Sequence, residues 1–227
     1  MEQNKYLIPL AIVLAGGFIA GAIYFGGGSG NLTTRNTNTS SSDQIDIIPV
    51  AETDHVLGNR NANLMIVEYS DTECPFCKVF HNTMKEVLRS YGDQVAWVYR
   101  HFPITQLHSK AVKEAEATEC AAELGGNQAF WNYTDRLFEI TNSNDSLDPA
   151  ELPRIATYVG LDETAFNACL SSGKYNEFVK NSVGEAVRAG ARGTPYSVIL
   201  AKDGRKVVIN GAEPFENVKA KIDALLR

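Results

Sequence analysis

The feature that most constrains the fold is a strand followed by a tight turn and a helix, with two cysteines where the helix begins. Residues 64–69 (LMIVEY) form a continuous apolar run typical of a buried strand, and residues 76–91 repeat apolar side chains at helical spacing. Residues 95–100 (VAWVYR) predict a second strand. A strand, a helix and a second strand in this order indicate an α/β fold with a right-handed crossover.

The chemistry of the chain is expected at Cys74-Pro75-Phe76-Cys77, which opens this helix. At a helix start, unpaired backbone N–H groups and the positive end of the helix dipole stabilise a thiolate. Such an environment lowers the pKa of a cysteine from about 8.5 to between about 3.5 and 7. We therefore expect Cys74 to be the exposed attacking thiol and Cys77, one turn inward, to be the resolving thiol of a redox disulfide.

Two cysteines at this spacing also form half of a zinc site, which needs a second pair of ligands. The other two cysteines, Cys120 and Cys169, are isolated, and neither has a cysteine or histidine partner at metal-ligand spacing. We therefore predict no metal ion and no other cofactor.

The rest of the domain predicts one sheet interrupted by a helical insertion. Helical patterns fill about residues 103–190, and they cover residues 109–124, 127–140, 149–159, 163–170 and 174–189. Residues 196–201 and 206–210 are short strands joined by an Asp-Gly turn as a hairpin, and residues 215–226 predict a closing amphipathic helix. The strands at both ends of the domain must share one sheet.

The N-terminal segment, residues 1–25, predicts a membrane anchor. Residues 6–25 carry no charged side chain, and a helix of this length spans about 30 Å, the thickness of a bilayer's hydrocarbon core. Lys5 precedes the run and no basic residue follows until Arg35, which favours a single-pass protein with its N-terminus inside. A cleaved signal peptide is the alternative, because an Ala-Gly-Ala triplet fits a signal peptidase site. Both interpretations place the domain on the extracytoplasmic side of the cell membrane.

Residues 26–44 are almost entirely Gly, Ser, Thr and Asn, and this composition predicts a flexible linker. Residues 45–227 then form the folded domain. We do not expect this domain to bind nucleic acid, because phosphate binding needs clustered Lys and Arg. The 21 basic residues of the chain are instead scattered among 27 acidic ones, for a net charge of −6.

Three segments resemble the DsbA-like branch of the thioredoxin fold, namely IVEYSDTECPFC at residues 66–77, YRHFP at residues 99–103, and GTP at residues 193–195. The resemblance spans about residues 50–225 and implies a thioredoxin-like fold with a central mixed β-sheet and an inserted all-helical subdomain. It also implies thiol–disulfide oxidoreductase activity on unfolded or partly folded exported proteins. Membrane-tethered bacterial members, which pair with an integral-membrane, quinone-linked reoxidising partner, look most similar.

The resemblance also assigns roles to residues by position. Pro195 matches a cis-proline beside the redox disulfide, and Thr194 would offer its backbone to a substrate strand. Pro75 and Phe76 complete the expected substrate-binding residues. Glu68 matches a buried acid that relays protons near the resolving thiol. A carboxylate in a buried strand must be used, paired or neutralised, so the alternative is that Glu68 reaches solvent or a lysine.

Cys120 and Cys169 both fall in the helical insertion. In an oxidising compartment two buried free thiols are disfavoured relative to a bridge, so we predict a structural disulfide between them. The alternative is two small core residues on separate helices.

Several charged side chains predict solvated surface. Glutamates around one predicted helix are interpreted as its solvated face, and these are Glu114, Glu116, Glu119 and Glu123. His55 and His81 are expected at the surface, whereas His101 and His108 flank the loop after the second strand and can line the active-site face.

The expected function is that of a thiol oxidase that introduces disulfides into exported proteins. A disulfide isomerase or reductase would use the same two thiols at a lower reduction potential. A tethered copper(I)-binding module would use them as soft ligands. Met-rich stretches would favour the copper module, and the chain has only Met1, Met65 and Met84.

Overall fold

The structure is a computed structural model that describes residues 45–227. The predicted anchor and linker lie outside the described residues. Within residues 45–227, no helix combines the length and the apolar character needed to cross a membrane. The elements follow in the order β1 (His55–Leu57), β2 (Leu64–Ser70), α2 (Pro75–Tyr91), a 3₁₀ turn η2 (Gly92–Gln94), β3 (Val95–His101), α3 (Ala111–Ile140), α4 (Glu151–Tyr158), α5 (Glu163–Ser172), α6 (Asn176–Arg188), β4 (Tyr196–Ala201), β5 (Lys206–Asn210) and α7 (Phe215–Leu225).

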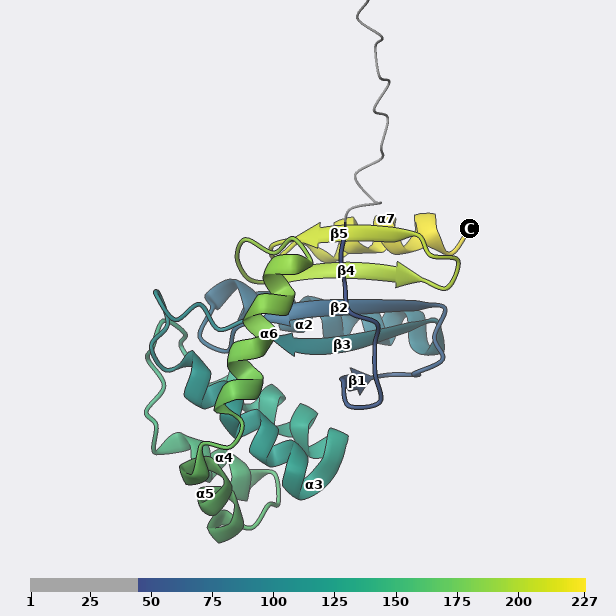
Figure 1. Cartoon of the computed structure of the whole chain (residues 1–227). Coiled ribbons are helices and arrows are strands. Elements are labelled where there is room, and N and C mark those ends of the chain that lie inside the picture. The colour runs from purple at the N-terminus through teal and green to yellow at the C-terminus, as the bar shows by residue number, and fades with distance from the viewer. Residues whose placement is uncertain (1–44) are drawn as a thin grey trace, which may run out of the picture. The chain divides into compact units, whose positions relative to one another are not determined.

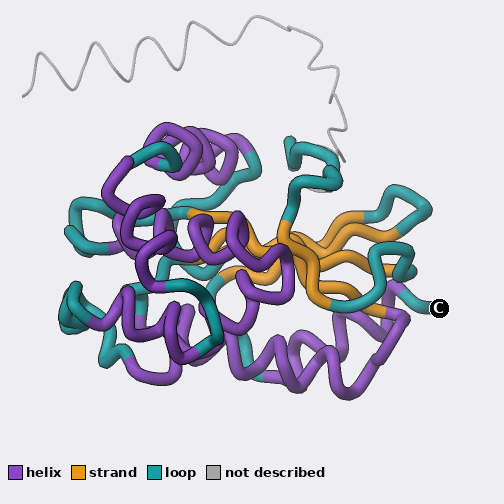
Figure 2. The backbone as a smooth tube through the Cα atoms, turned by 90° about the horizontal axis from the view of Figure 1, so that it is seen from below, coloured by secondary structure: helices purple, strands orange, loops and turns teal. Residues whose placement is uncertain are grey.

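The described strands form one mixed sheet in the order β1-β3-β2-β4-β5, which confirms the predicted sheet. Strands β2 and β3 are parallel, and the other neighbouring pairs are antiparallel. Helix α6 crosses one face of the sheet, while α2 and α7 cover the opposite face (Figure 1). Figure 2 shows the strands as a layer with helices on both sides. Because both faces are covered, the central strands are apolar along most of their length.

The helical insertion consists of α3 to α6, as predicted, and has an apolar core of its own formed by α3, α4 and α5. The two helices expected at residues 109–124 and 127–140 are joined in α3, which breaks at Gly126. The φ angle of Gly126 is 70°, in the left-handed region that glycine adopts without a side-chain clash. Gly126 therefore separates α3 into two helical segments, which correspond to the two predicted helices.

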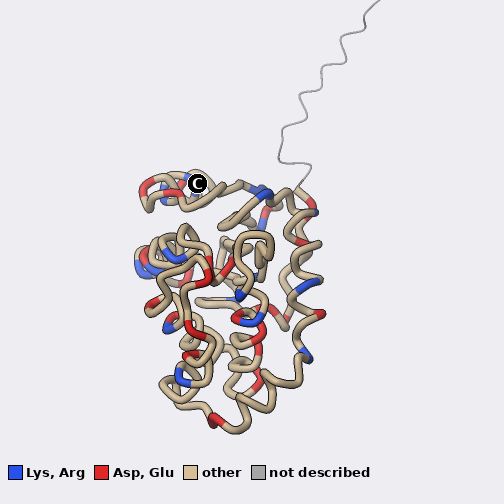
Figure 3. The backbone as a smooth tube through the Cα atoms, turned by 90° about the vertical axis from the view of Figure 1, so that its left-hand side faces the viewer, with Lys and Arg blue, Asp and Glu red and all other residues tan. Residues whose placement is uncertain are grey.

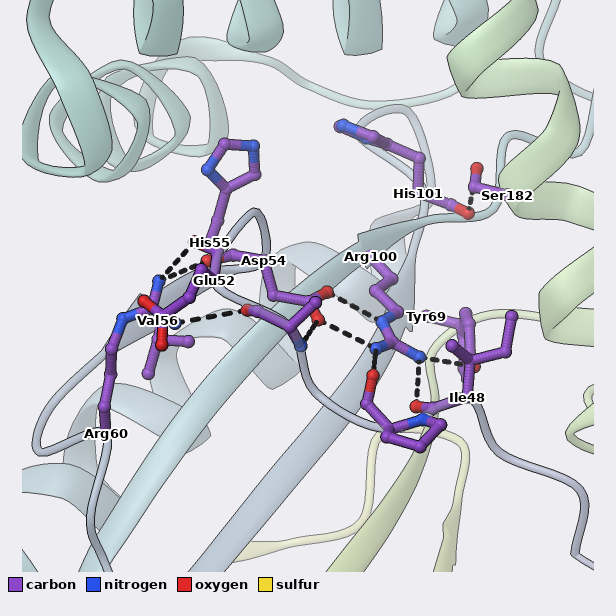
Figure 4. A network of polar contacts seen from close by, with 12 residues as sticks. Ile48, Glu52, Asp54, His55, Val56, Arg60, Tyr69, Arg100, His101 and Ser182 are labelled. Atoms are coloured by element: carbon purple, nitrogen blue, oxygen red, sulfur yellow. Dashed lines mark hydrogen bonds and ion pairs between the residues drawn. The ribbon is translucent and has the colours of Figure 1, made fainter.

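Strand β1 was not predicted, because three residues are too few to show a periodic pattern. It is fixed to the sheet by Arg100 at the end of β3 (Figure 4). The Arg100 guanidinium donates to both carboxylate oxygens of Asp54 at 2.9 Å, and to the backbone carbonyl of Ile48 at 3.1 Å. The Nη1 atom that donates to Ile48 also donates to the Tyr69 hydroxyl at 3.3 Å. This network ties the segment before β1 to the two central strands.

The prediction of a solvated acidic face on α3 is wrong for three of its four glutamates. Glu114, Glu116 and Glu119 are buried, because this part of α3 packs between the sheet and α6. Glu119 Oε1 lies 2.9 Å from His55 Nε2 and 2.7 Å from His101 Nε2. Burial opposes the ionised form of Glu119, but the two imidazoles outweigh it and lower the pKa to about 2. Lys and Arg residues are interspersed with Asp and Glu residues along the described chain (Figure 3).

The prediction that His55 and His81 lie at the surface is also wrong. His81 is 3% exposed, and its Nε2 lies 2.6 Å from Asp135 Oδ1. His55 is partly buried and stacks on Phe130 with ring centroids 3.6 Å apart. Both rings pack against aromatic side chains of the interior, a long-range contact that local sequence does not encode.

Candidate active site

The loop between β2 and α2 holds the first cysteine at the start of the helix. Asp71 organises this loop, because its Oδ1 accepts the N–H of Glu73 at 2.9 Å and its carbonyl accepts the N–H of Cys74 at 3.1 Å. Cys74 is the N-cap residue, and Pro75 follows at the first helical position. Proline is favoured there because the missing N–H would have no partner within the helix.

Cys74 and Cys77 are both free thiols, so the structure describes the reduced form of the pair. Cys74 is 5% exposed and Cys77 is fully buried. The expectation of an exposed Cys74 is therefore too strong, since only a small part of this residue reaches the surface. The Cys74 thiol donates to the carbonyl of Thr194 at 3.4 Å, and the N–H of Asp71 donates to Cys77 Sγ at 3.4 Å.

The two thiols have opposite pKa shifts. The pKa of Cys74 is lowered to about 6, first because the Cys77 thiol can donate to the Cys74 thiolate. Burial opposes this shift, while the Thr194 side chain and the backbone N–H groups of Phe76 and Cys77 add to it. Burial, followed by the neighbouring Cys74, raises the pKa of Cys77 well above its ordinary value. At neutral pH the pair therefore holds one thiolate, on Cys74.

The predicted substrate-binding residues surround Cys74. The Thr194–Pro195 peptide bond is cis, and Thr194 lies against the Cys74 thiol. Pro75 and Phe76 are exposed, and the Phe76 side chain is accompanied by a second exposed apolar residue, Val79, one turn along α2. The small exposed part of Cys74 is thus bordered by the apolar side chains of Phe76 and Val79.

Glu68 lies inside the sheet, on the same side as Cys77. It is 1% exposed, and its Oε2 accepts a hydrogen bond from the indole N–H of Trp97 at 2.8 Å. The alternative in which Glu68 reaches solvent or a lysine is therefore wrong. Burial is the main cause that raises the pKa of Glu68 to about 7, although the neighbouring Ser70 hydroxyl and the Trp97 indole N–H oppose it. A carboxyl group with this pKa can both donate and accept a proton near neutral pH.

Sequence reasoning missed the role of Asp71. Its side chain is fully buried, accepts the N–H of Ile104 at 2.7 Å, and lies 2.9 Å from His108 Nδ1. Burial works against a charged His108, but Asp71 outweighs this effect and raises the pKa of the imidazole. The only local signal was an Asp placed in a turn just before a helix, where its side chain can accept backbone N–H groups.

A second buried acid, Glu73, fixes the cysteine loop to the helical insertion. Its Oε2 accepts the N–H of Asp145 at 2.5 Å, and its carbonyl accepts the N–H of Asn144 at 2.8 Å. Burial and the adjacent Glu73 carboxylate raise the pKa of Glu114 to about 9, so Glu114 is protonated at neutral pH. Glu114 therefore adds no negative charge beside Glu73 and Cys74.

Cys120 and Cys169 are joined by a disulfide that connects α3 to α5, within the core of the helical insertion. This bridge is separate from the redox pair. In the described part of the chain, no group of three or more His, Cys, Asp or Glu side chains is arranged to hold a metal ion.

A mixed sheet with a helical insertion, and two thiols at the start of the helix after a central strand, define a DsbA-type thiol–disulfide oxidoreductase fold. The sequence profile of the thioredoxin family matches residues 50–224, and the chain belongs to this family. Among solved structures, DsbA2 of Pseudomonas aeruginosa is 29% identical, with a TM-score of 0.66 over 79% of this chain and 97% of that one. Oxidised BdbD of Bacillus subtilis is 20% identical, with a TM-score of 0.68 over 81% and 98% of the two chains, and so shows the fold.

Curated relatives include much longer proteins. The chain is 37% identical over 158 residues to the Na⁺/H⁺ antiporter NhaA 3 of Salinispora tropica, and 31% identical over 176 residues to the Na⁺/H⁺ antiporter NhaA of Herminiimonas arsenicoxydans. These matches take in 69% and 78% of this chain, but only 23% and 26% of the antiporters. The chain therefore spans about a quarter of the length of these two relatives, and their named activity belongs to the longer proteins.

Proposed function

We propose that this protein is a thiol oxidase that introduces disulfides into unfolded or partly folded exported proteins through Cys74 and Cys77. The observation that carries the proposal is the low pKa of Cys74, about 6, beside a Cys77 whose pKa is raised. Stabilising the Cys74 thiolate stabilises the reduced form of the pair. A pair whose reduced form is stabilised is a stronger oxidant.

The first step of the reaction uses the disulfide form of the pair. A substrate thiolate attacks Cys74 Sγ, a new bond joins substrate and Cys74, and the bond between Cys74 and Cys77 breaks. Cys77 leaves with the bonding electron pair and takes up a proton, which Glu68 supplies. A proton source is needed because Cys77 is buried, and a thiolate of raised pKa is a poor leaving group.

The second step releases the substrate. A second substrate thiolate attacks the substrate sulfur of the mixed disulfide, and Cys74 leaves as a thiolate. This departure needs no proton, because a group with a pKa of about 6 is already stable as the anion at neutral pH. In total, two electrons pass from two substrate thiols to the cysteine pair, one proton ends on Cys77, and one is released.

Substrate recognition is assigned to the surface around Cys74. In this proposal the backbone of Thr194, before Pro195, pairs with an extended substrate segment; the position of Thr194 against the Cys74 thiol and the exposed apolar side chains of Phe76 and Val79 support it. An unfolded chain exposes backbone groups and apolar side chains together, so this surface suits such substrates better than a folded partner.

The proposal includes a membrane setting. Residues 1–25 would anchor the protein with its N-terminus inside, and residues 26–44 would hold the domain on the extracytoplasmic side. There an integral-membrane partner linked to quinone would take two electrons from the reduced pair and restore its disulfide. Carbonate extraction of membranes tests the anchor, because an anchored protein stays in the pellet and a cleaved one enters the supernatant.

The reduction potential of the Cys74–Cys77 pair decides between oxidase and reductase. The full chain is equilibrated in glutathione buffers and its thiols are counted, with a Cys74→Ala/Cys77→Ala variant to subtract the second disulfide. A potential near about −120 mV is expected for an oxidase, and one near about −270 mV would assign the protein to the reductases. Oxidation of a dithiol peptide by the disulfide form, which a Cys74→Ser variant should not perform, provides the activity readout.

A further inference from the structure

A row of polar side chains lies under Cys77 on the apolar face of the sheet. Glu68 on β2 is directly paired with Tyr99 on β3 and with Ser197 on β4. Ser70 follows Glu68 by two residues on the same strand, so its side chain lies on the same face. All four side chains are at most 2% exposed, and they are enclosed by the apolar core that also contains Cys77.

These four residues share an unusual property. Glu68 Oε1, Ser70 Oγ, Tyr99 Oη and Ser197 Oγ are all buried, and each lacks a hydrogen-bond partner among residues 45–227. Buried polar atoms without partners are rare because each has lost its hydrogen bonds to water without replacing them. A group of them that serves no purpose would be replaced by apolar side chains at a gain in stability. Their clustering beside a redox thiol indicates that at least one of them has a chemical use there.

Ser70 connects this cluster to Cys77. It is the last residue of β2, and the N–H of the next residue, Asp71, donates to Cys77 Sγ. The Ser70 hydroxyl also lowers the pKa values of Glu68 and Cys77. It also lowers that of Tyr99. A hydroxyl group is both a donor and an acceptor and can rotate between partners.

We propose that the Ser70 hydroxyl relays the proton between Glu68 and Cys77. When the disulfide opens, the Cys77 thiolate takes the hydroxyl proton of Ser70, and Ser70 takes the carboxyl proton of Glu68. The products are a Cys77 thiol, an unchanged serine and a Glu68 carboxylate. When the disulfide reforms, Cys77 loses its proton by the reverse route. The inference rests on the proposed function, and it makes Ser70 a proton-transfer residue between Glu68 and Cys77.

The pH dependence of the relay is set by the groups that face Glu68. These are Cys74 and Cys77 from α2 and Tyr99 from β3, while β4 contributes only the Ser197 hydroxyl. Tyr99 and Cys77 stay protonated at neutral pH because burial raises both of their pKa values well above their ordinary ranges. Cys74 is part of the disulfide when the step begins. Glu68 is therefore the group that titrates near pH 7.

The test compares Ser70→Ala with Ser70→Thr and Ser197→Ala in the full chain. Ser197 is a matched control because it is also a buried, unpartnered serine beside Glu68, but unlike Ser70 it does not adjoin the residue whose N–H binds Cys77 Sγ. The Cys74–Cys77 disulfide is mixed with dithiothreitol at several pH values, and the reaction is stopped by acid and alkylation. The rate is divided by the thiolate fraction of the reagent, so that only protein groups shape the profile.

The expected result is a loss of at least about tenfold in rate for Ser70→Ala at pH 7, within the lower part of the effects known for general acid–base groups. Its profile should lose the wild-type inflection near pH 7, Ser70→Thr should recover most of the rate, and Ser197→Ala should match wild type. Ser70→Ala combined with Glu68→Gln should be no slower than either single variant, because both remove one relay.

Two results would overturn the relay. One is a Ser70→Ala rate and pH profile equal to those of Ser197→Ala. The other is a double variant whose loss is the product of the two single losses, since independent effects multiply. Dithiothreitol reacts with any accessible cysteine pair, so these outcomes do not depend on the thiol oxidase assignment. That assignment fails separately, if the wild-type protein does not oxidise a dithiol peptide.

Discussion

Two buried glutamates in this domain should respond to the same substitution in opposite ways. Glu68 has a pKa raised to about 7 because it is buried with only neutral hydrogen-bond partners, and Glu119 has a pKa lowered to about 2 because two imidazoles face it. Glu68→Gln and Glu119→Gln each remove one ionisable carboxyl at nearly constant volume. The pair of variants therefore separates the sign of an electrostatic effect from the effect of the substitution itself.

The magnitude follows from the pKa values of the folded and unfolded states. The folded pKa of Glu68 lies above its ordinary value of 4.5, so the folded state binds more protons than the unfolded state between about pH 4.5 and 7. The free energy of unfolding therefore decreases as the pH rises through this window. The total loss is about 3 kcal/mol, because one pKa unit corresponds to about 1.4 kcal/mol. Glu68→Gln should match wild type below about pH 4.5 and be about 3 kcal/mol more stable above about pH 8.

The sign is reversed for Glu119. Its folded pKa lies below the ordinary value, so its ionised form contributes stability that is fully present above about pH 4.5 and is lost as the pH falls toward 2. Glu119→Gln should therefore cost about 3 kcal/mol at pH 7, and the difference from wild type should shrink in acid.

Urea unfolding of the full chain, followed at about pH 4, 7 and 8.5, measures both effects as changes in the unfolding midpoint. The Cys74–Cys77 pair is kept reduced with the second disulfide intact, because the reduced pair is the state to which these pKa values belong. The reasoning is refuted if Glu68→Gln destabilises the protein equally at all three pH values. That outcome would mean that Glu68 has the same pKa in the folded and unfolded states, and that the substitution removes a contact that does not depend on ionisation.

Two further substitutions test the framework of the domain. Replacing Cys120 and Cys169 together by serine should lower the free energy of unfolding by about 4 kcal/mol in the chain-entropy model, because the bridge joins residues 49 positions apart. Urea unfolding measures this loss. A loss below about 1 kcal/mol would show that the unfolded chain gains little freedom when the bridge is removed. Arg100→Lys should lower the free energy of unfolding by about 2–3 kcal/mol, because lysine cannot donate to both Asp54 oxygens in the same way. Hydrogen exchange should then increase first in residues 45–57. An increase spread evenly over the sheet would contradict the proposed role of Arg100.

The elements of the sheet could be predicted because their signals are local. The apolar run at residues 64–69 corresponds to β2, and the hairpin strands match β4 and β5 residue for residue. Helix α2 begins one residue earlier than expected, at Pro75. In each case apolar spacing and turn residues within the segment itself determine the structure.

The environment of the redox pair could be predicted only in part, because much of it comes from distant segments. Glu114 lies far from Glu73 in the sequence, yet Glu73 is one of the main causes of its raised pKa. His108 meets Asp71 across 37 positions of chain. The amphipathic pattern of α3 favours a solvated acidic face, but the helix is enclosed on several sides, so the pattern does not reveal which face meets water.

The opposite pKa shifts of the two cysteines connect the buried acid to the direction of the reaction. The helix start that stabilises the Cys74 thiolate places Cys77 one turn deeper, where burial raises its pKa. A strong oxidant of this design must release a poor leaving group into the protein interior during its first step, so it needs a proton donor on the inner side of the pair. Glu68 is in that place and is half protonated near pH 7. The burial that raises its pKa also makes its ionised form unfavourable for the stability of the folded domain. On the proposed mechanism, the stability that Glu68 costs above pH 7 is therefore the consequence of a pKa suited to transferring a proton in both directions.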